Sequence, residues 1–267
     1  MNNREKFKLI SDTNFKYSGV VENVFDFVEN KQFLRPDLWK RFVQQFREDS
    51  DFDAGWRGEY WGKMMRGASL VYSYTKNEKL YKILTETVRD MIESADESGR
   101  ISSYGKNHEF DGWDLWCRKY VLLGMQYFLD ICKDDKLYTD VVSSMKKQAD
   151  YIIEHIGSGD GKIEITAATQ NWNGLNSSSI LEPIVRLYNL TNEKKYLDFA
   201  EYIISCGGID NGNIFELAYE NKLYPYQYPV TKAYEMISCF EGLLEYYKTV
   251  GNEKHKTTII NFADKIL

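Results

Sequence analysis

The sequence predicts an all-α protein built from repeated helical hairpins that form an incomplete (α/α)6 toroid. Two observations carry this prediction: a short polar motif recurs at a nearly constant spacing, and apolar residues with a helical period flank its copies. The chain has 267 residues, 43% of them hydrophobic, so it is long enough to bury a sizeable core.

The repeated motif is Asn-Glu-Lys-Leu-Tyr at residues 77–81, and related pentapeptides begin at Asp134, Asn192 and Asn252. Consecutive copies are 57, 58 and 60 residues apart. Asn and Asp are typical of short turns, so each copy predicts the turn of one hairpin. A period near 60 residues is too long for helical repeats of about 34 residues. It suits a toroid in which the first helices line an inner ring and the second helices surround them.

The apolar pattern supports the helices on both sides of these turns. After the third turn, Tyr196, Phe199 and Ile203 fall on one helical face, and Ile180, Ile184 and Leu187 keep the same period before it. Two further helices are expected at residues 20–28 and 38–46, with Pro36 near the start of the second, where a missing N–H costs little.

The predicted organisation is one α/α-toroid domain over residues 1–267 with about five hairpins. It is expected to lack the C-terminal helices of a complete ring. A smaller, open helical array is the alternative.

Composition and charge exclude several classes of function. The net charge is −6 and no basic stripe is present, so nucleic acid is not an expected partner. The sequence contains no run of about 18 apolar residues, so no membrane span is predicted. The charged N-terminus does not resemble a signal peptide. The scattered thiols indicate reduced cysteines and a cytoplasmic location. They are Cys117, Cys132, Cys206 and Cys239.

No metal site is expected in this chain. Its three histidines, His108, His155 and His255, lie far apart and show no metal-ligand spacing. Cys117 has no histidine near it in sequence and is interpreted as a small buried hydrophobe.

Aromatic and charged residues gather where the predicted inner helices begin. Five of the six tryptophans lie there: Trp56, Trp61, Trp113, Trp116 and Trp172. If the motif turns lie at one pole of the toroid, these segments lie at the other. Flat apolar rings beside charged hydrogen-bonding groups suit a sugar, so a carbohydrate ligand is predicted at this pole.

Four segments resemble glycoside hydrolase family 127, which includes β-L-arabinofuranosidases. They are Asp-Leu-Trp-Cys-Arg-Lys-Tyr-Val-Leu-Leu-Gly at 114–124, Asn-Ser-Ser-Ser-Ile-Leu-Glu-Pro-Ile-Val-Arg-Leu-Tyr at 176–188, and the segments at 195–203 and 232–242. The resemblance spans roughly residues 7–267. It implies an α/α-toroid catalytic domain followed by β-rich domains.

The resemblance also implies a zinc-bound cysteine nucleophile and a glutamate acid/base. These elements come later in the family's chain than Leu267, and none of the four cysteines here matches them. No zinc or other cofactor is therefore expected in this chain. At three positions where arabinofuranosidases of the family carry a sugar-binding histidine, this sequence has Tyr120, Ser177 and Lys232.

The resemblance and the aromatic pole together predict a glycoside hydrolase-like protein, or part of one, that acts on plant- or microbe-derived oligosaccharides. The alternatives are a non-catalytic carbohydrate-binding or scaffold protein, and another sugar-active toroid enzyme such as an epimerase or an unsaturated-glucuronyl hydrolase. The absence of paired histidines at the aromatic pole disfavours an epimerase. A scaffold would not need clustered tryptophans. The sugar, its linkage and the oligomeric state stay open.

Glycoside hydrolysis needs an acid for the leaving oxygen and a second group that supplies or activates the nucleophile. The candidate carboxylates in this chain are Glu59, Asp114 and Glu235. The predicted substrate-binding residues are Trp56, Arg57, Lys63, Trp113, Arg118, Tyr120, Trp172, Asn173, Ser177 and Lys232.

Each candidate also has a structural interpretation. Glu182 could complete a capping box with Ser179, and Asp111 or Asp114 could cap a helix. Trp61 and Trp116 could be core residues, and Glu59 could pair with Arg118.

Overall fold

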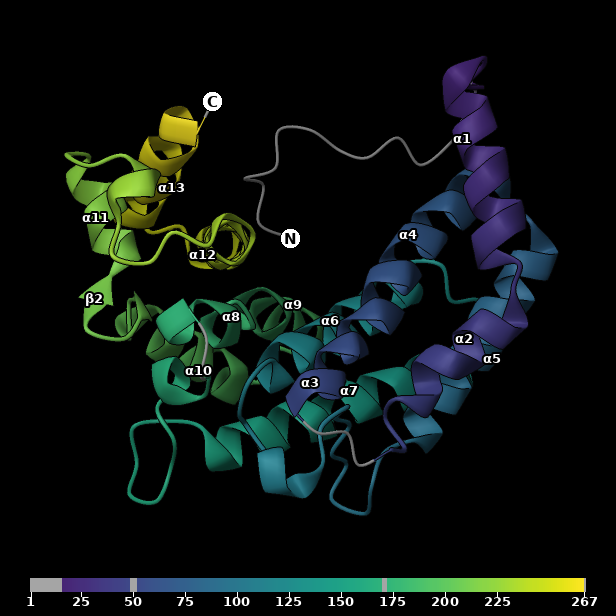
Figure 1. Cartoon of the computed structure of the whole chain (residues 1–267), viewed down its shortest axis with the longest axis horizontal. Coiled ribbons are helices and arrows are strands. Elements are labelled where there is room, and N and C mark those ends of the chain that lie inside the picture. The colour runs from purple at the N-terminus through teal and green to yellow at the C-terminus, as the bar shows by residue number, and fades with distance from the viewer. Residues whose placement is uncertain (1–15, 49–51, 170–171, 267) are drawn as a thin grey trace.

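The computed structural model describes residues 16–48, 52–169 and 172–266. Within these ranges the chain is helical apart from loops and one two-stranded hairpin. Paired helices follow one another around an open arc (Figure 1). The predicted all-α, toroid-like fold is confirmed. No helix among these residues is long and apolar enough to cross a membrane.

Four helical hairpins make up most of the described arc, and α1 (Val20–Val28) and α2 (Pro36–Gln44) precede them, with α2 packed against α5. The hairpins are α4 (Glu59–Thr75) with α5 (Glu78–Glu93), α6 (Asp114–Leu129) with α7 (Asp135–His155), α9 (Leu181–Thr191) with α10 (Lys194–Ser205), and α12 (Ala233–Val250) with α13 (Glu253–Ile266). Helices α4, α6, α9 and α12 lie on the inner side, and α5, α7, α10 and α13 on the outer side (Figure 1). In α6 every residue except Tyr127 is buried.

Short elements connect these hairpins. They are the π-helix Glu29–Phe33, α3 (Phe52–Gly55), α8 (Leu175–Ser178), α11 (Ile214–Glu220), the antiparallel strands β1 (Gly208–Ile209) and β2 (Gly212–Asn213), and 3-10 turns at Trp56–Gly58, Lys106–His108, Ile165–Ala167, Trp172–Gly174 and Pro225–Gln227. The sequence pattern predicted neither the β-hairpin nor α11.

The third inner helix is broken into α8 and α9 at Ser179 and Ile180. The Ser179 hydroxyl donates to the carbonyl of Asn176 at 2.6 Å, and the Ile180 amide donates to Ser177 at 3.2 Å. Short-range bonds of this kind compete with regular α-helix bonds. The capping box expected here is wrong, because Ser179 donates to a carbonyl and Glu182 pairs with Arg186 at 3.0 Å.

Three of the four repeated motifs form helix N-caps. The side chains of Asn77, Asp134 and Asn252 accept hydrogen bonds from backbone amides of the helix that follows, at 2.9–3.0 Å. Asn192 instead ends α9 with a left-handed backbone, φ 56°, and Glu193 takes the N-cap place of α10. Asn tolerates this conformation better than most residues. The third copy is therefore shifted by one residue relative to the others.

The motif turns and the tryptophan segments lie at opposite poles, as predicted. Each turn follows the C-terminus of an inner helix, and each tryptophan segment precedes an N-terminus. The 17 residues of α4 separate the two ends by about 25 Å. We call the end with the tryptophan segments the site pole and the other end the turn pole.

Two glycines bring the backbones of α4 and α6 into contact. A Cβ atom at Gly62 would lie 1.8 Å from the carbonyl oxygen of Tyr120, and a Cβ at Gly124 would lie 2.9 Å from the Cα of Gly62. Only residues without a side chain permit this approach. The contact sets the relative position of the two helices whose N-termini form much of the site pole.

Candidate functional site

A cavity of about 310 Å³ opens at the site pole where α4, α6 and α12 begin. Its lining is Trp56, Glu59, Lys63, Trp113, Trp116, Tyr234 and Glu235. Both glutamates stand in the first turn of a helix, where the partial positive charge of the N-terminus favours carboxylates. The cavity therefore combines indole walls with two acidic groups.

Glu59 has two polar partners. Its carboxylate accepts a hydrogen bond from Nε1 of Trp116 and lies 2.9 Å from the ammonium of Lys63, one turn along α4. The Lys63 nitrogen also lies 4.8 Å from the ring centre of Tyr120 and 5.1 Å from that of Tyr234. Glu59 is thus already engaged by groups of the protein itself.

Glu235 has a different environment. It is 3% exposed, and its Oε2 atom has no hydrogen-bond partner among the residues that the structure describes. Burial raises the pKa of this carboxyl, and the charge of Lys232 opposes the rise. A buried polar atom without a partner is uncommon in folded proteins. The arrangement shifts this carboxyl toward its protonated form, in a residue that lines the cavity.

Two tyrosines connect α6 with α12 beside this cavity. The hydroxyls of Tyr120 and Tyr234 are 2.6 Å apart. Burial, followed by the hydrogen bond with Tyr234, raises the pKa of Tyr120, so its hydroxyl stays protonated. Tyr120 is 2% exposed and stands behind the cavity lining.

An exposed indole stands in a strained loop near the start of α12. Trp172, Asn173 and Gly174 all have positive φ, at 61°, 44° and 100°. Such backbones are unfavourable for a residue as bulky as Trp and often occur at functional sites. Trp172 is 42% exposed, and the ammonium of Lys232 lies 4.9 Å from its ring centre.

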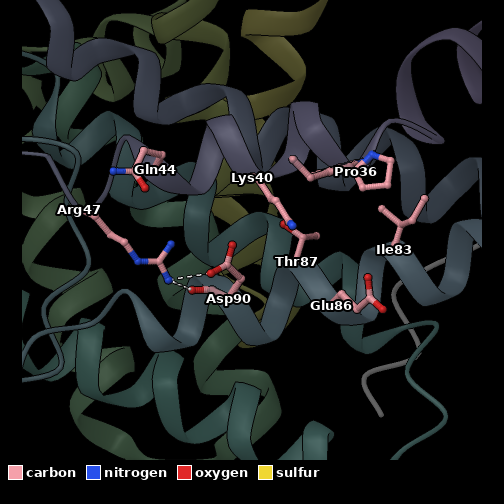
Figure 2. Close-up of a pocket in the computed structure, with 9 residues that line it drawn as sticks. Pro36, Lys40, Gln44, Arg47, Ile83, Glu86, Thr87 and Asp90 are labelled. Carbon is pink, nitrogen blue, oxygen red and sulfur yellow. Dashed lines mark hydrogen bonds and ion pairs between the residues drawn. The ribbon is translucent and has the colours of Figure 1, made fainter.

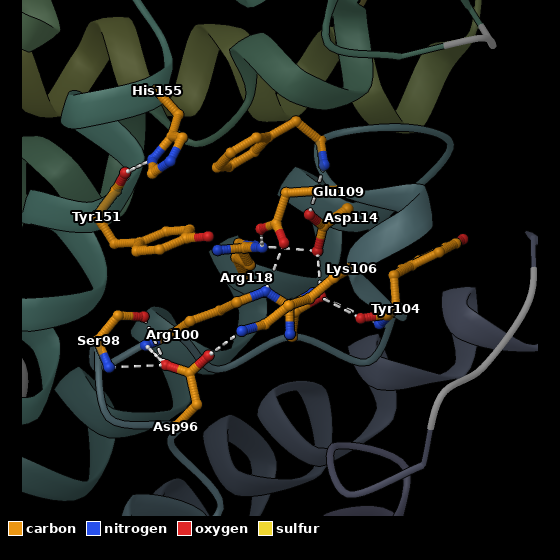
Figure 3. Close-up of polar contacts among 12 residues, drawn as sticks. Asp96, Ser98, Arg100, Tyr104, Lys106, Glu109, Asp114, Arg118, Tyr151 and His155 are labelled. Carbon is orange, nitrogen blue, oxygen red and sulfur yellow. Dashed lines mark hydrogen bonds and ion pairs between the residues drawn. The ribbon is translucent and has the colours of Figure 1, made fainter.

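Asp114 and Arg118 belong to a buried ion network that does not line the cavity (Figure 3). Asp114 accepts from the hydroxyl of Ser102 at 2.5 Å and from Nε of Arg118 at 2.9 Å. Arg118 also pairs with Glu109, which lies 2.6 Å from Arg100. The suggested pair between Glu59 and Arg118 does not form, because each has nearer partners.

Other predicted residues are placed as follows. Ser177 is 1% exposed, and its hydroxyl donates to the carbonyl of Ile165 at 2.6 Å. The exposed Arg57 lies over Trp56 at 5.9 Å. Trp61 is a core residue that donates to the hydroxyl of Thr87 at 3.0 Å. Cys117 is fully buried, which confirms its interpretation as a small hydrophobe.

The structure thus brings five of the predicted residues to the cavity wall: Trp56, Glu59, Lys63, Trp113 and Glu235. The sequence did not predict that Trp116 and Tyr234 line the cavity. Trp116 is buried, as its core interpretation predicts, and its N–H also donates to Glu59 at the cavity. Tyr234 could have been predicted as a lining residue, because it directly precedes the candidate acid Glu235.

The described residues do not fit a zinc centre. No group of three or more His, Cys, Asp or Glu side chains in this part of the chain is arranged to hold a metal ion. Cys117 and Cys239 are buried, and their thiols contact backbone carbonyls. The absence of zinc from this chain remains a prediction, and no chemical step is assigned to a metal here.

A second cavity, of about 330 Å³, lies on the outer side between α2 and α5 (Figure 2). Its charged residues include Lys40, Arg47, Glu86 and Asp90, and Arg47 lies 2.7 Å from Asp90. It has one indole, Trp39, whose N–H donates to Phe33 at 2.9 Å. It therefore lacks the combination of several aromatic walls and an unpartnered acid that marks the site pole.

The arc of hairpins and the cavity at its inner pole define a toroid-like helical protein with a sugar-compatible site. The family model of the β-L-arabinofuranosidase GH127 catalytic domain matches residues 23–267. The chain therefore belongs to this glycoside hydrolase family.

Solved structures share the fold at low identity. A GH127 β-L-arabinofuranosidase from Geobacillus stearothermophilus T6 is 15% identical, with a TM-score of 0.67, over 92% of this chain and 44% of that one. A GH127 β-arabinofuranosidase is 16% identical, with a TM-score of 0.58, over 91% and 38%. A structure described as a glycoside hydrolase is 15% identical, with a TM-score of 0.61, over 94% and 36%. The chain thus spans less than half of each. No curated protein sequence matches it significantly.

Proposed function

We propose that the chain binds a glycoside in the site-pole cavity and takes part in hydrolysis of its glycosidic bond. The observation that carries the proposal is the buried, unpartnered oxygen of Glu235 in a cavity walled by indoles. A sugar ring stacks on such walls through its apolar face, and its oxygens accept hydrogen bonds from a protonated acid. Membership of the GH127 family supports the same class of ligand.

The two carboxyl groups of the cavity suit different roles in this chemistry. Glu235, whose pKa is raised by burial, is the proposed proton donor to the leaving oxygen. Glu59, paired with Lys63 and bonded to Trp116, is the proposed carboxylate that activates the attacking group or stabilises positive charge on the sugar ring. Such a division of roles between two carboxyls is common to most glycosidases.

The β-L-arabinofuranosidase activity of the relatives makes L-arabinofuranosides the first substrates to test. The proposed reaction is release of 4-nitrophenol from 4-nitrophenyl β-L-arabinofuranoside, with other 4-nitrophenyl pentosides and hexosides alongside. Replacement Glu235→Gln removes the proton while keeping the shape. We expect it to lower kcat by a factor of about 10²–10⁴ and to leave sugar binding nearly unchanged.

The matched control is Glu86→Gln on the outer face, which should retain full activity. Equal activity in the wild type and Glu235→Gln would reject Glu235 as the donor. Sugar binding by a folded wild-type chain that shows no turnover would favour the non-catalytic carbohydrate-binding alternative. A folded chain that binds no sugar would contradict the proposal altogether.

A further inference from the structure

We propose that Lys232 and Trp172 form a second subsite, at the rim of the cavity, that binds the carboxylate of an acidic sugar. The inference rests on the proposed function, since it assumes a glycoside in the neighbouring cavity. It adds the chemical class of the sugar, namely one that carries a negatively charged group on its ring.

The position of the pair next to the cavity is set by α12. Lys232 is the N-cap residue of this helix, and Tyr234 and Glu235 of its first turn line the cavity. Trp172 comes from a different segment and meets Lys232 at 4.9 Å. A ligand that fills the cavity and extends past Tyr234 would reach the exposed indole and the ammonium together.

The ammonium of Lys232 is available for a ligand. No carboxylate among the described residues forms an ion pair with it. By contrast, the charge of Lys63 is already balanced by Glu59 at 2.9 Å. The ammonium of Lys232 is therefore an unpaired cation at the start of α12, beside the cavity. An unpaired cation favours an anionic ligand.

The backbone that follows this indole is held in place by its neighbours. The carbonyl of Asn173 accepts a hydrogen bond from the amide of Asp210 at 2.7 Å, which ties the left-handed run to the β-hairpin loop. A Cβ at Gly174 would lie 2.9 Å from the Cα of Thr166, so the loop packs closely against its neighbour. A sugar stacked on a preorganised ring loses less entropy on binding than one that must order a mobile loop.

The test compares D-galacturonate with D-galactose, which differ only in the carboxylate at C6. Binding is measured by ligand-observed NMR or calorimetry at low and high salt. We expect galacturonate to bind about fivefold more tightly at low salt, as for a partly exposed ion pair, and the preference to shrink as salt screens it. Lys232→Gln should abolish the preference, and Lys232→Arg should retain it. Lys79→Gln, at the turn pole, removes the same charge and should change nothing.

The possible results separate this inference from the proposed function. Equal binding of both sugars by the wild type, or a preference for galacturonate that survives Lys232→Gln, would reject the carboxylate subsite. If the chain nevertheless binds galactose or hydrolyses an arabinofuranoside, the proposed function stands. Failure of a folded chain to bind either sugar would reject the carboxylate subsite, and the proposed function would fall with it only if the 4-nitrophenyl glycosides are neither bound nor hydrolysed.

Discussion

Asp114 and Glu235 are both buried carboxyl groups in the first turn of an inner helix, yet their surroundings differ. Asp114 accepts bonds from a hydroxyl, a backbone amide and a guanidinium. Glu235 has an oxygen with no partner among the described residues, and it borders a cavity. The comparison teaches that burial alone does not identify a functional acid. Asp114 uses its bonding capacity to hold the fold together, whereas Glu235 keeps part of its capacity for a ligand.

The largest expected effect comes from breaking the network around Asp114. Arg118→Met leaves the buried carboxylate of Asp114 without its guanidinium, while Glu109 keeps its pair with Arg100. We expect the free energy of unfolding to fall by about 3–5 kcal/mol, measured by urea denaturation. The control is Arg89→Met, which removes a half-exposed pair with Asp134 at 2.8 Å and should cost less than about 1 kcal/mol. Similar losses of unfolding free energy in the two variants would mean that burial of the Asp114 network adds nothing to stability.

Lys119 extends the comparison of buried charged groups to a cation. It is 1% exposed, forms no ion pair with a described carboxylate, and lies 4.6 Å from the Trp116 ring centre. Burial lowers the pKa of Lys119 from its ordinary value of 10.5 to about 8. The protonated side chain therefore destabilises the fold below pH 8, by about 3 kcal/mol at most. Lys119→Met should accordingly raise the unfolding free energy at pH 7 by about 1–3 kcal/mol, since the lost cation–π contacts offset part of the gain.

The pH dependence gives a second measurement of the same variant. Between pH 8 and 10.5 the unfolded wild type holds more protons than the folded form, so wild-type stability rises with pH in this window. The Lys119→Met variant lacks this rise, and its advantage should disappear near pH 10.5. An advantage that stays constant from pH 7 to 10.5 would show that Lys119 is not desolvated as described.

The smallest expected effect is that of Glu235→Gln on stability. The pKa of Glu235 is raised above its ordinary value of 4.5, so the folded state holds the proton more tightly than the unfolded state. The contribution of Glu235 to the free energy of unfolding is fully present below pH 4.5 and is lost as pH rises through the folded pKa. Glu235→Gln should be within about 1 kcal/mol of the wild type at pH 4.5, and should gain on it as pH rises. A loss above about 2 kcal/mol throughout would place Glu235 in the same class as Asp114.

Much of the architecture follows from local sequence signals. The motif spacing and the helical period predicted the hairpins, because turns and amphipathic faces are determined by residues that are close together in the sequence. The range 20–28 coincides with α1, and Pro36 opens α2 as expected. The break between α8 and α9 was not predictable in this way, since it depends on whether the Ser179 hydroxyl bonds forward or backward.

The site was only partly predictable for a related reason. The tryptophans and Glu235 could be placed at the pole, because the repeat gives the direction of each helix. Whether a charged residue there faces the cavity or the core depends on its partners in distant segments. Glu109 and Arg100 belong to the irregular stretch before α6, which has no period, so the pairing of Glu109 with both Arg100 and Arg118 left no sequence signal.

The contact between Gly62 and Gly124 has a consequence for how this site can change. The spacing of the two walls that carry Glu59 and Trp116 is set by backbone touching backbone, not by the side chains that face the ligand. Substitutions at the cavity can therefore alter its chemistry without moving its walls. A helical ring clamped in this manner can acquire a new sugar preference through single side-chain replacements, while the frame that holds them stays unchanged.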